Sequence, residues 1–220
     1  PQAPWNYSIF FNIDGLTNEY DGDAYFLEKK ELVRVPCFDR LEIIEFPQPL
    51  GDLEAAVTSG GLSTMPWTFK GKLTKLENKT LRYPGHWEWM KAYRQLGLFS
   101  QDNVKFKGMK IIPREFYHAL LEPQIDNGRV EDVCIMRICC KGNHKDKPQT
   151  VWVNTVEYYD KETGFSAMEK WTGWHASILL IAAAHGKLEK GVIPVEKAMT
   201  GTKFKKEAEL RNYEISITVT

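Results

Sequence analysis

The chain has 220 residues, of which 43% are hydrophobic and 12% aromatic, so it is long enough to bury a substantial core. Its 29 Lys and Arg balance 29 Asp and Glu, so there is no global attraction to nucleic acid or to an anionic membrane. No apolar run is long enough to span a bilayer and no signal-like segment opens the chain, so we expect a cytoplasmic protein with neither nucleic acid nor membrane as a partner.

The first fifth of the chain predicts short strands. Residues 1–22 are aromatic and turn-rich. The apolar stretches 24–27 and 32–36 flank a polar segment and predict a β-hairpin, and a third strand is expected over 41–46, before two prolines. The loop 58–64 is rich in Gly, Ser and Thr, so its backbone and hydroxyl groups are a candidate ligand contact.

Two helices are predicted in the middle of the chain. After Gly85, apolar residues recur at helical spacing from His86 to Leu96, and Gly97 is a good helix stop. A second helix is expected over 113–121, with Pro113 in its first turn and Pro123 after its end.

The last third predicts a strand pair and an apolar helix. Strands over 132–140 and 149–159 read as an antiparallel pair joined by the polar loop 141–147. Both strands carry apolar residues on both faces, so we expect helices or a second subunit to cover each face of this sheet. The stretch 172–185 is apolar nearly all round and predicts a helix that needs burial on every side.

A short helix over 202–210 and a strand over 213–219 end the chain. Together the elements predict an α+β fold, with a mixed, largely antiparallel sheet, helices on one face and the other face available for dimerisation through the 132–159 strands.

Several common chemistries are absent from the sequence. No two of the 16 glycines are separated by a single residue, so neither a Rossmann fingerprint nor a P-loop is present. There is no G-x-S-x-G, H-E-x-x-H or C-x-x-C motif, and the spacing of the four cysteines matches no zinc site (Cys37, Cys134, Cys139 and Cys140). We therefore expect no metal site.

The run Lys79–His86 is the strongest candidate site. Arg82 offers a planar fork of donors that suits a carboxylate. His86 opens a helix whose N-terminus favours an anion and lowers the pKa of the imidazole, so a neutral His86 is a candidate base. The alternative is an ordinary strand-to-helix turn in which the imidazole is only packed. Other polar groups that could converge with this run are Tyr83, Ser63, Thr64 and the triplet Asn18, Glu19 and Tyr20, whose alternative is a set of turn and surface residues.

Seven stretches in series resemble the C-terminal half of the saccharopine dehydrogenase-like family, most closely its compact lysine 6-dehydrogenase-type members. The T-L-R-Y-x-G element within Lys79–His86 is the most specific of them. The others are residues 15–20, 60–66, 113–116, 158–168, 172–174 and 190–194.

The resemblance implies a two-domain oxidoreductase of amino-acid metabolism. An N-terminal Rossmann domain, absent here, would bind NAD or NADP, and residues 1–220 would form the substrate pocket and the homodimer interface. The tail, about 170–220, would pack either under the sheet or on the Rossmann domain. The family reaction is hydride transfer between the nicotinamide and a carbon bonded to an amine nitrogen, so the isolated chain should be inactive.

The resemblance also assigns roles to the candidate residues. Arg82 would anchor the α-carboxylate of a small amino-acid substrate. Tyr83 and His86 would lie near the reacting amine as the catalytic candidates, with His86 moving a proton or activating water. Ser63 and Thr64 would complete the floor of the pocket, and Asn18, Glu19 and Tyr20 complete the predicted substrate-binding set.

Three functions remain open at this level. The compact 128–160 region favours L-lysine 6-dehydrogenase; a saccharopine or carboxynorspermidine dehydrogenase is the second choice. A non-catalytic domain that binds an amino acid or a partner protein is the third. The chain begins at Pro1 without an initiator Met, so we expect it to be part of a longer protein.

Overall fold

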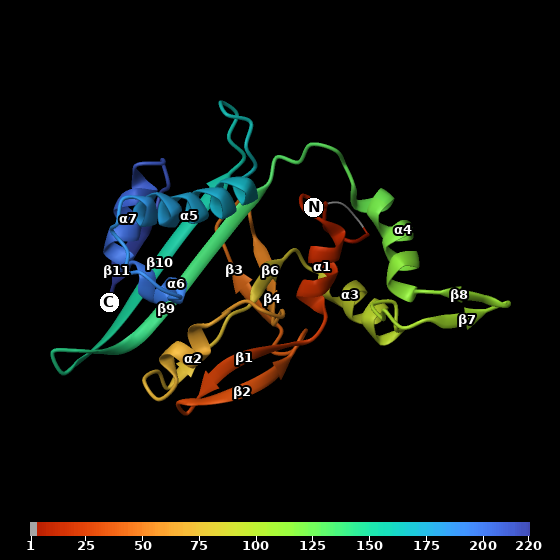
Figure 1. Ribbon diagram of the computed structural model, residues 1–220, viewed down its shortest axis with the longest axis horizontal. Helices are drawn as coiled ribbons and strands as arrows, with labels where there is room; N and C mark the ends of the chain where they lie inside the picture. The colour runs from red at the N-terminus through yellow and green to blue at the C-terminus, as the bar shows by residue number, and fades with distance from the viewer. Residues whose placement is uncertain (1–3) are drawn as a thin grey trace. The chain divides into compact units, whose positions relative to one another are not determined.

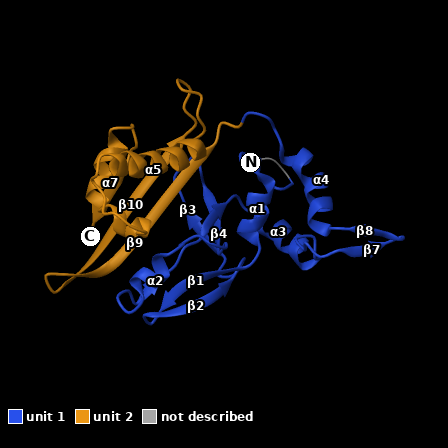
Figure 2. Ribbon diagram, viewed as in Figure 1, with its two compact units in different colours: residues 1–129 blue, residues 130–220 orange. Residues whose placement is uncertain are grey.

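A computed structural model describes residues 4–220, so Pro1 lies outside the described part, and the chain divides into two compact units, residues 1–129 and 130–220 (Figure 2). Unit 1 contains α1 (Ile13–Tyr20), β1 (Asp23–Glu28), β2 (Glu31–Pro36), β3 (Glu42–Glu45), β4 (Asp52–Ala56), α2 (Met65–Phe69), β5 (Lys75–Leu76), β6 (Thr80–Arg82), α3 (His86–Gln95), β7 (Val104–Phe106), β8 (Met109–Ile111) and α4 (Pro113–Ile125). Unit 2 contains β9 (Val133–His144), β10 (Lys147–Tyr158), α5 (Ala167–Ala184), α6 (Val195–Ala198), α7 (Gly201–Glu209) and β11 (Ser216–Val219).

Unit 1 combines small antiparallel sheets with three longer helices (Figure 1). The strand orders are β2-β1-β5 and β3-β4-β6, and β7 pairs with β8 as a separate ribbon. Its main core is an aromatic cluster to which α1, α3 and α4 each contribute, with Tyr20, Met90 and Ile125 fully buried. This burial is the main force that holds the three helices together.

The strands and helices predicted before residue 100 are confirmed. The hairpin forms from β1 and β2, the third strand is β3, and α3 begins at His86 as expected. Helix α1 was not predicted, because Gly15 and Asn18 weaken the helical pattern. It forms because the Asn12 side chain accepts hydrogen bonds from the N–H groups of Asp14 and Gly15, and because its apolar face is buried.

The predicted end of α4 was wrong. The helix continues through Pro123 to Ile125. A proline removes only the bond from its own N–H and strains the preceding turn. Here that cost is offset because Ile125 is completely buried and its carbonyl accepts the N–H of Ile9 at 2.9 Å.

Unit 2 is built on the predicted antiparallel pair, which is longer than expected. Strands β9 and β10 pair in continuous register from Val133 opposite Tyr158 to His144 opposite Lys147, and β11 adds a third strand beside β10. The segment predicted as a loop is therefore mostly strand. Only Lys145 and Asp146 form the turn, both with positive φ, which suits the twist of a tight hairpin. Polar side chains misled the prediction because this end of the ribbon is exposed to water.

The predicted apolar helix is present as α5, which begins earlier, after a capping box formed by Ser166 and Glu169. It packs against β9 and α7 within unit 2. Within unit 2 the helix is not buried on every side as predicted, because Leu180 is 70% exposed and Ile181 is 45% exposed.

The α+β class with antiparallel sheets is confirmed, although the strands form several small sheets rather than one. Among residues 4–220, no helix is both long and apolar enough to cross a membrane. Within the same residues, no cluster of three or more His, Cys, Asp or Glu side chains could hold a metal ion.

Candidate functional site

The candidate site begins where β6 ends. Arg82 is the last residue of β6 and lies opposite Glu54 of β4. The following turn leads into α3 through Gly85, whose φ of 90° lies in the left-handed region. A side chain would strain this conformation, so glycine allows the sharp change from strand to helix. The turn places Arg82 and His86 close together in unit 1.

The guanidinium of Arg82 is held by three hydrogen bonds. Its Nε donates to Tyr20 Oη at 3.1 Å, one terminal nitrogen donates to the carbonyl of Leu81 at 3.0 Å, and the other donates to a carboxylate oxygen of Glu19 at 3.0 Å. The guanidinium carbon also lies over three aromatic rings, those of Tyr7, Tyr20 and Trp87, at 5.5–5.9 Å from their centroids. Only 14% of the Arg82 side chain is exposed.

A chain of hydrogen bonds runs inward from Arg82 to His86. The Nδ1 of His86 lies 2.9 Å from the carbonyl oxygen of Trp5, and its Nε2 lies 2.9 Å from Tyr20 Oη. A carbonyl only accepts, so Nδ1 carries the proton and Nε2 accepts from the Tyr20 hydroxyl. Tyr20 therefore accepts from Arg82 and donates to His86, and each group fixes the direction of the next.

Burial determines the protonation state of this chain. Desolvation, and then the nearby charge of Arg82, lower the pKa of His86 to about 3. Burial raises the pKa of Tyr20 to about 12, against the opposing effect of Arg82. At neutral pH His86 is thus a neutral, fully buried ring whose acceptor nitrogen is already used by Tyr20. This arrangement suits a residue that positions Tyr20 and Arg82 better than one that takes a proton from a substrate.

The N-terminus of α3, predicted to favour an anion, receives a carboxylate from the chain itself. The N–H of Gly85 donates to Glu54 Oε2 at 3.1 Å. The indole Nε1 of Trp87 donates to the carbonyl oxygen of Glu54 at 3.1 Å. Glu54 therefore fixes the start of α3. The sequence pattern of β4 did not predict this role for Glu54, because Glu54 lies 31 residues before Gly85.

Asn18 serves a second arginine, Arg114, which the sequence reasoning did not select as a site residue. Arg114 is buried and donates to Phe99 O at 2.8 Å, to Asn18 Oδ1 at 2.9 Å and to Asp21 Oδ2 at 2.6 Å. It thereby joins the start of α4 to the end of α1. The only signal for it was its place in one of the seven stretches that resemble the family.

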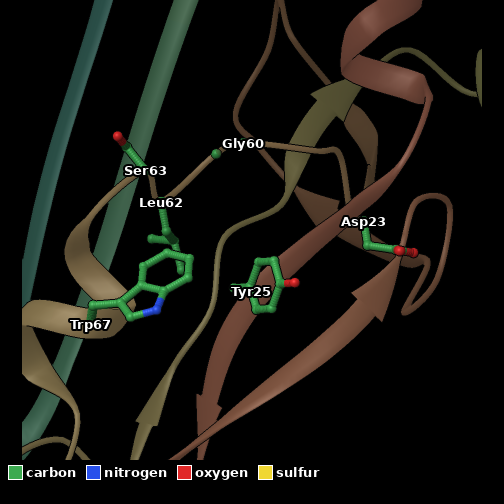
Figure 3. A pocket seen from close by; sticks show the side chains of 7 residues that line it. Asp23, Tyr25, Gly60, Leu62, Ser63 and Trp67 are labelled. Atoms are coloured by element: carbon green, nitrogen blue, oxygen red, sulfur yellow. The ribbon is translucent and has the colours of Figure 1, made fainter.

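Ser63 borders a different hollow from the one expected. It lines a pocket with the aromatic rings of Tyr25 and Trp67, and its hydroxyl points away from those rings (Figure 3). Thr64 precedes α2. Tyr83 is half-buried, and its carbonyl accepts the N–H of His86 at 3.3 Å.

Of the predicted site residues, hydrogen bonds therefore join Glu19, Tyr20, Arg82 and His86 into one group. Asn18 is bonded instead to Arg114, and Ser63 lies at the border of another pocket. The roles assigned to all eight residues remain predictions.

Comparisons with known proteins agree with the resemblance. A model of the saccharopine dehydrogenase C-terminal domain family matches residues 1–209. Among solved structures, the chain is similar to apo histidine-tagged saccharopine dehydrogenase (L-Glu forming) from Saccharomyces cerevisiae, with a TM-score of 0.73 and 14% sequence identity. That match covers 99% of this chain but 63% of the other, so the chain spans less than two thirds of that protein. At this identity the likeness shows a shared fold.

Proposed function

Because the chain belongs to the saccharopine dehydrogenase C-terminal domain family, we propose that it forms the substrate-binding part of an NAD(P)-dependent oxidoreductase that acts on the C–N bond of an amino acid. Within this class we favour L-lysine 6-dehydrogenase activity for the full-length protein. The isolated chain is expected to be inactive.

The observation that carries the proposal is the environment of Arg82. The guanidinium already binds one carboxylate, that of Glu19, in a surrounding that excludes most water. An arginine has five N–H donors, and the three hydrogen bonds to described residues leave donors for a ligand. Tyr20 and the rings beneath the guanidinium hold its plane in place. These features support a fixed site for the α-carboxylate of an amino acid.

The described residues do not fit the cofactor themselves. A dinucleotide pyrophosphate is usually held by a glycine-rich turn between a strand and a helix, and the sequence has no G-x-G. We assign NAD or NADP to a part of the protein outside this chain, and we derive no step through it. The contribution of this chain is to bind and orient the substrate.

The assembly belongs to the same proposal. We place a homodimer contact on the sheet of unit 2, where β9 leaves Met136 and Ile138 about 40% exposed. The small amino acid is the only other partner proposed, and we expect the protein to act in the cytoplasm.

The test uses the full-length protein that contains this chain. NAD⁺ and NADP⁺ reduction is measured with L-lysine, saccharopine and carboxynorspermidine. For the amino acid that is oxidised, we expect Arg82→Ala to lower kcat/KM about 100-fold, because a buried carboxylate loses its charged partner.

The matched control is Arg40→Ala. Arg40 also pairs with carboxylates, those of Glu28 and Glu77, and also lies over an aromatic ring, that of Phe26, but it is outside the candidate site. We expect this control to change kcat/KM less than about twofold. Undiminished kcat/KM in Arg82→Ala on every amino acid tested would remove the carboxylate role.

A further inference from the structure

Tyr7 is a buried residue with an unused polar group. Only 7% of it is exposed, and its hydroxyl has no hydrogen-bond partner among the described residues. Leaving a buried hydroxyl unpaired costs free energy, because its bonds to water are lost and not replaced. Its neighbour Tyr20 is satisfied on both sides, by Arg82 and His86. An unpaired hydroxyl in a cluster whose other polar groups are hydrogen-bonded suggests that its partner is a ligand.

The position of Tyr7 relates it to Arg82. Its ring centroid lies 5.5 Å from the guanidinium carbon of Arg82 and 5.0 Å from the centroid of the His86 ring. Burial raises the pKa of Tyr7, and the charges of Arg82 and Glu19 act on it in opposite directions. At neutral pH the hydroxyl is therefore protonated and can donate.

The neighbouring charge defines the chemistry of the missing partner. A group that accepts from a tyrosine hydroxyl and is also attracted to an adjacent guanidinium is an oxygen anion with more than one acceptor atom. The Glu19 carboxylate meets this description, but among residues 4–220 it bonds only to Arg82, and its side chain is 38% exposed. A ligand carboxylate can bind the donors of Arg82 that its three hydrogen bonds to described residues leave over, beside Glu19.

We propose that Tyr7 is a substrate-binding residue, whose hydroxyl donates a hydrogen bond to the carboxylate of the amino acid that Arg82 holds. The inference rests on the proposed function of Arg82. It extends that function to a residue of the N-terminal segment that no sequence motif marks. It also gives a role to a buried hydroxyl that has no hydrogen-bond partner among the described residues.

The test compares Tyr7→Phe with the wild-type full-length enzyme on two amines. L-lysine carries the α-carboxylate, and 1,5-diaminopentane has the same chain without it. We expect Tyr7→Phe to raise KM for L-lysine about tenfold with kcat within twofold, because one hydrogen bond to a charged group is lost. Binding of 1,5-diaminopentane, measured as a substrate or as a competitive inhibitor, should stay unchanged. Without ligand, the Tm of Tyr7→Phe should equal or exceed that of the wild type.

Tyr213→Phe is the matched control, because Tyr213 of unit 2 also has a buried hydroxyl without a partner among the described residues. It should leave both amines unaffected. An unchanged KM for L-lysine in Tyr7→Phe, an equal loss for both amines, or a Tm below that of Tyr213→Phe would each overturn the role of Tyr7. If Arg82→Ala weakens L-lysine binding and Tyr7→Phe does not, only this inference fails. If Arg82→Ala has no effect, the proposed role of Arg82 fails with it, and a wild type that neither oxidises nor binds L-lysine removes the L-lysine assignment.

Discussion

The role inferred for His86 from the sequence differs from the one that its surroundings in the structure suggest. As the first residue of α3 it suggested a base that faces a substrate. In the fold it is completely buried, and its two nitrogens are bonded to Trp5 and Tyr20. Protonation of His86 at Nε2 would remove the acceptor of the Tyr20 hydroxyl, and the charge of Arg82 disfavours a second positive charge nearby. The hydrogen bond to His86 therefore orients the Tyr20 hydroxyl, which in turn accepts from Arg82.

This burial predicts a pH dependence of stability. In the unfolded chain His86 gains a proton below about pH 6.5, whereas in the folded chain its pKa is lowered to about 3. Between these values the unfolded state binds more protons, so the free energy of unfolding falls as pH falls, by up to about 1.4 kcal/mol per pH unit. Above about pH 6.5 the contribution is constant.

The measurement is a series of urea titrations between pH 7 and pH 4 on the wild type and His86→Gln. The variant should be less stable at pH 7 but should lose less stability on acidification. The pKa of His118 is also lowered by burial, but that residue is present in both proteins and cancels in the comparison. Parallel pH curves for the two proteins would contradict the buried neutral state of His86.

At the scale of elements, the start of α5 depends on residues outside the helix. The carboxylate of Asp132 accepts the N–H groups of Ala167 and Met168 at 2.7 and 2.9 Å. Ser166 adds the cap to Glu169 at 3.1 Å. The helix therefore begins where Asp132, just before β9, can reach it, which is why its start precedes the purely apolar stretch.

Removing these two caps should have unequal effects. Ser166→Ala should lower the free energy of unfolding of unit 2 by about 1 kcal/mol, the usual cost of an N-cap. Asp132→Ala should cost more, about 2–3 kcal/mol, because the buried N–H of Ala167 and the partly buried N–H of Met168 lose their acceptor. Amide hydrogen exchange of β9 and β10 reports both changes. Equal protection in the two variants would show that Asp132 is not the principal cap.

At the scale of the whole molecule, the chain divides at residue 129 into two compact units. The aromatic cluster around Tyr20 and Ile125 belongs entirely to unit 1. The Lys170–Glu157 ion pair, with both side chains nearly buried, belongs to unit 2.

We expect the two units to open as separate cooperative blocks in native-state hydrogen exchange of the chain. Asp132→Ala should then lower protection across β9, β10 and α5 while leaving α1, α3 and α4 unchanged. Arg114→Ala should do the reverse, because Arg114 joins α1 to α4. A uniform loss of protection over the whole chain in either variant would show a single cooperative unit instead.

Local features were readable from the sequence because their causes are local. The hairpin of β1 and β2, the start of α3 after Gly85 and the pairing of β9 with β10 follow from the alternation of side chains and from turn chemistry. The T-L-R-Y-x-G element and its companion stretches identified the family, which the family match over residues 1–209 confirms. The sequence likewise shows directly that residues 1–220 contain no G-x-G motif of the dinucleotide-binding type.

The partners of each polar group were decided only by the tertiary structure. Glu19 and Tyr20 lie more than 60 residues from Arg82 in sequence, and Trp5 lies 81 residues from His86. No spacing rule relates positions so far apart, because packing of the aromatic core brings them together. The same packing buries His86 and brings Glu54 to the N-terminus of α3. It also places the ring of Tyr7 against Arg82 and leaves its hydroxyl without a partner among the described residues. The sequence alone determined that an arginine lies just before the N-terminus of a helix, and the fold decided which groups orient that arginine.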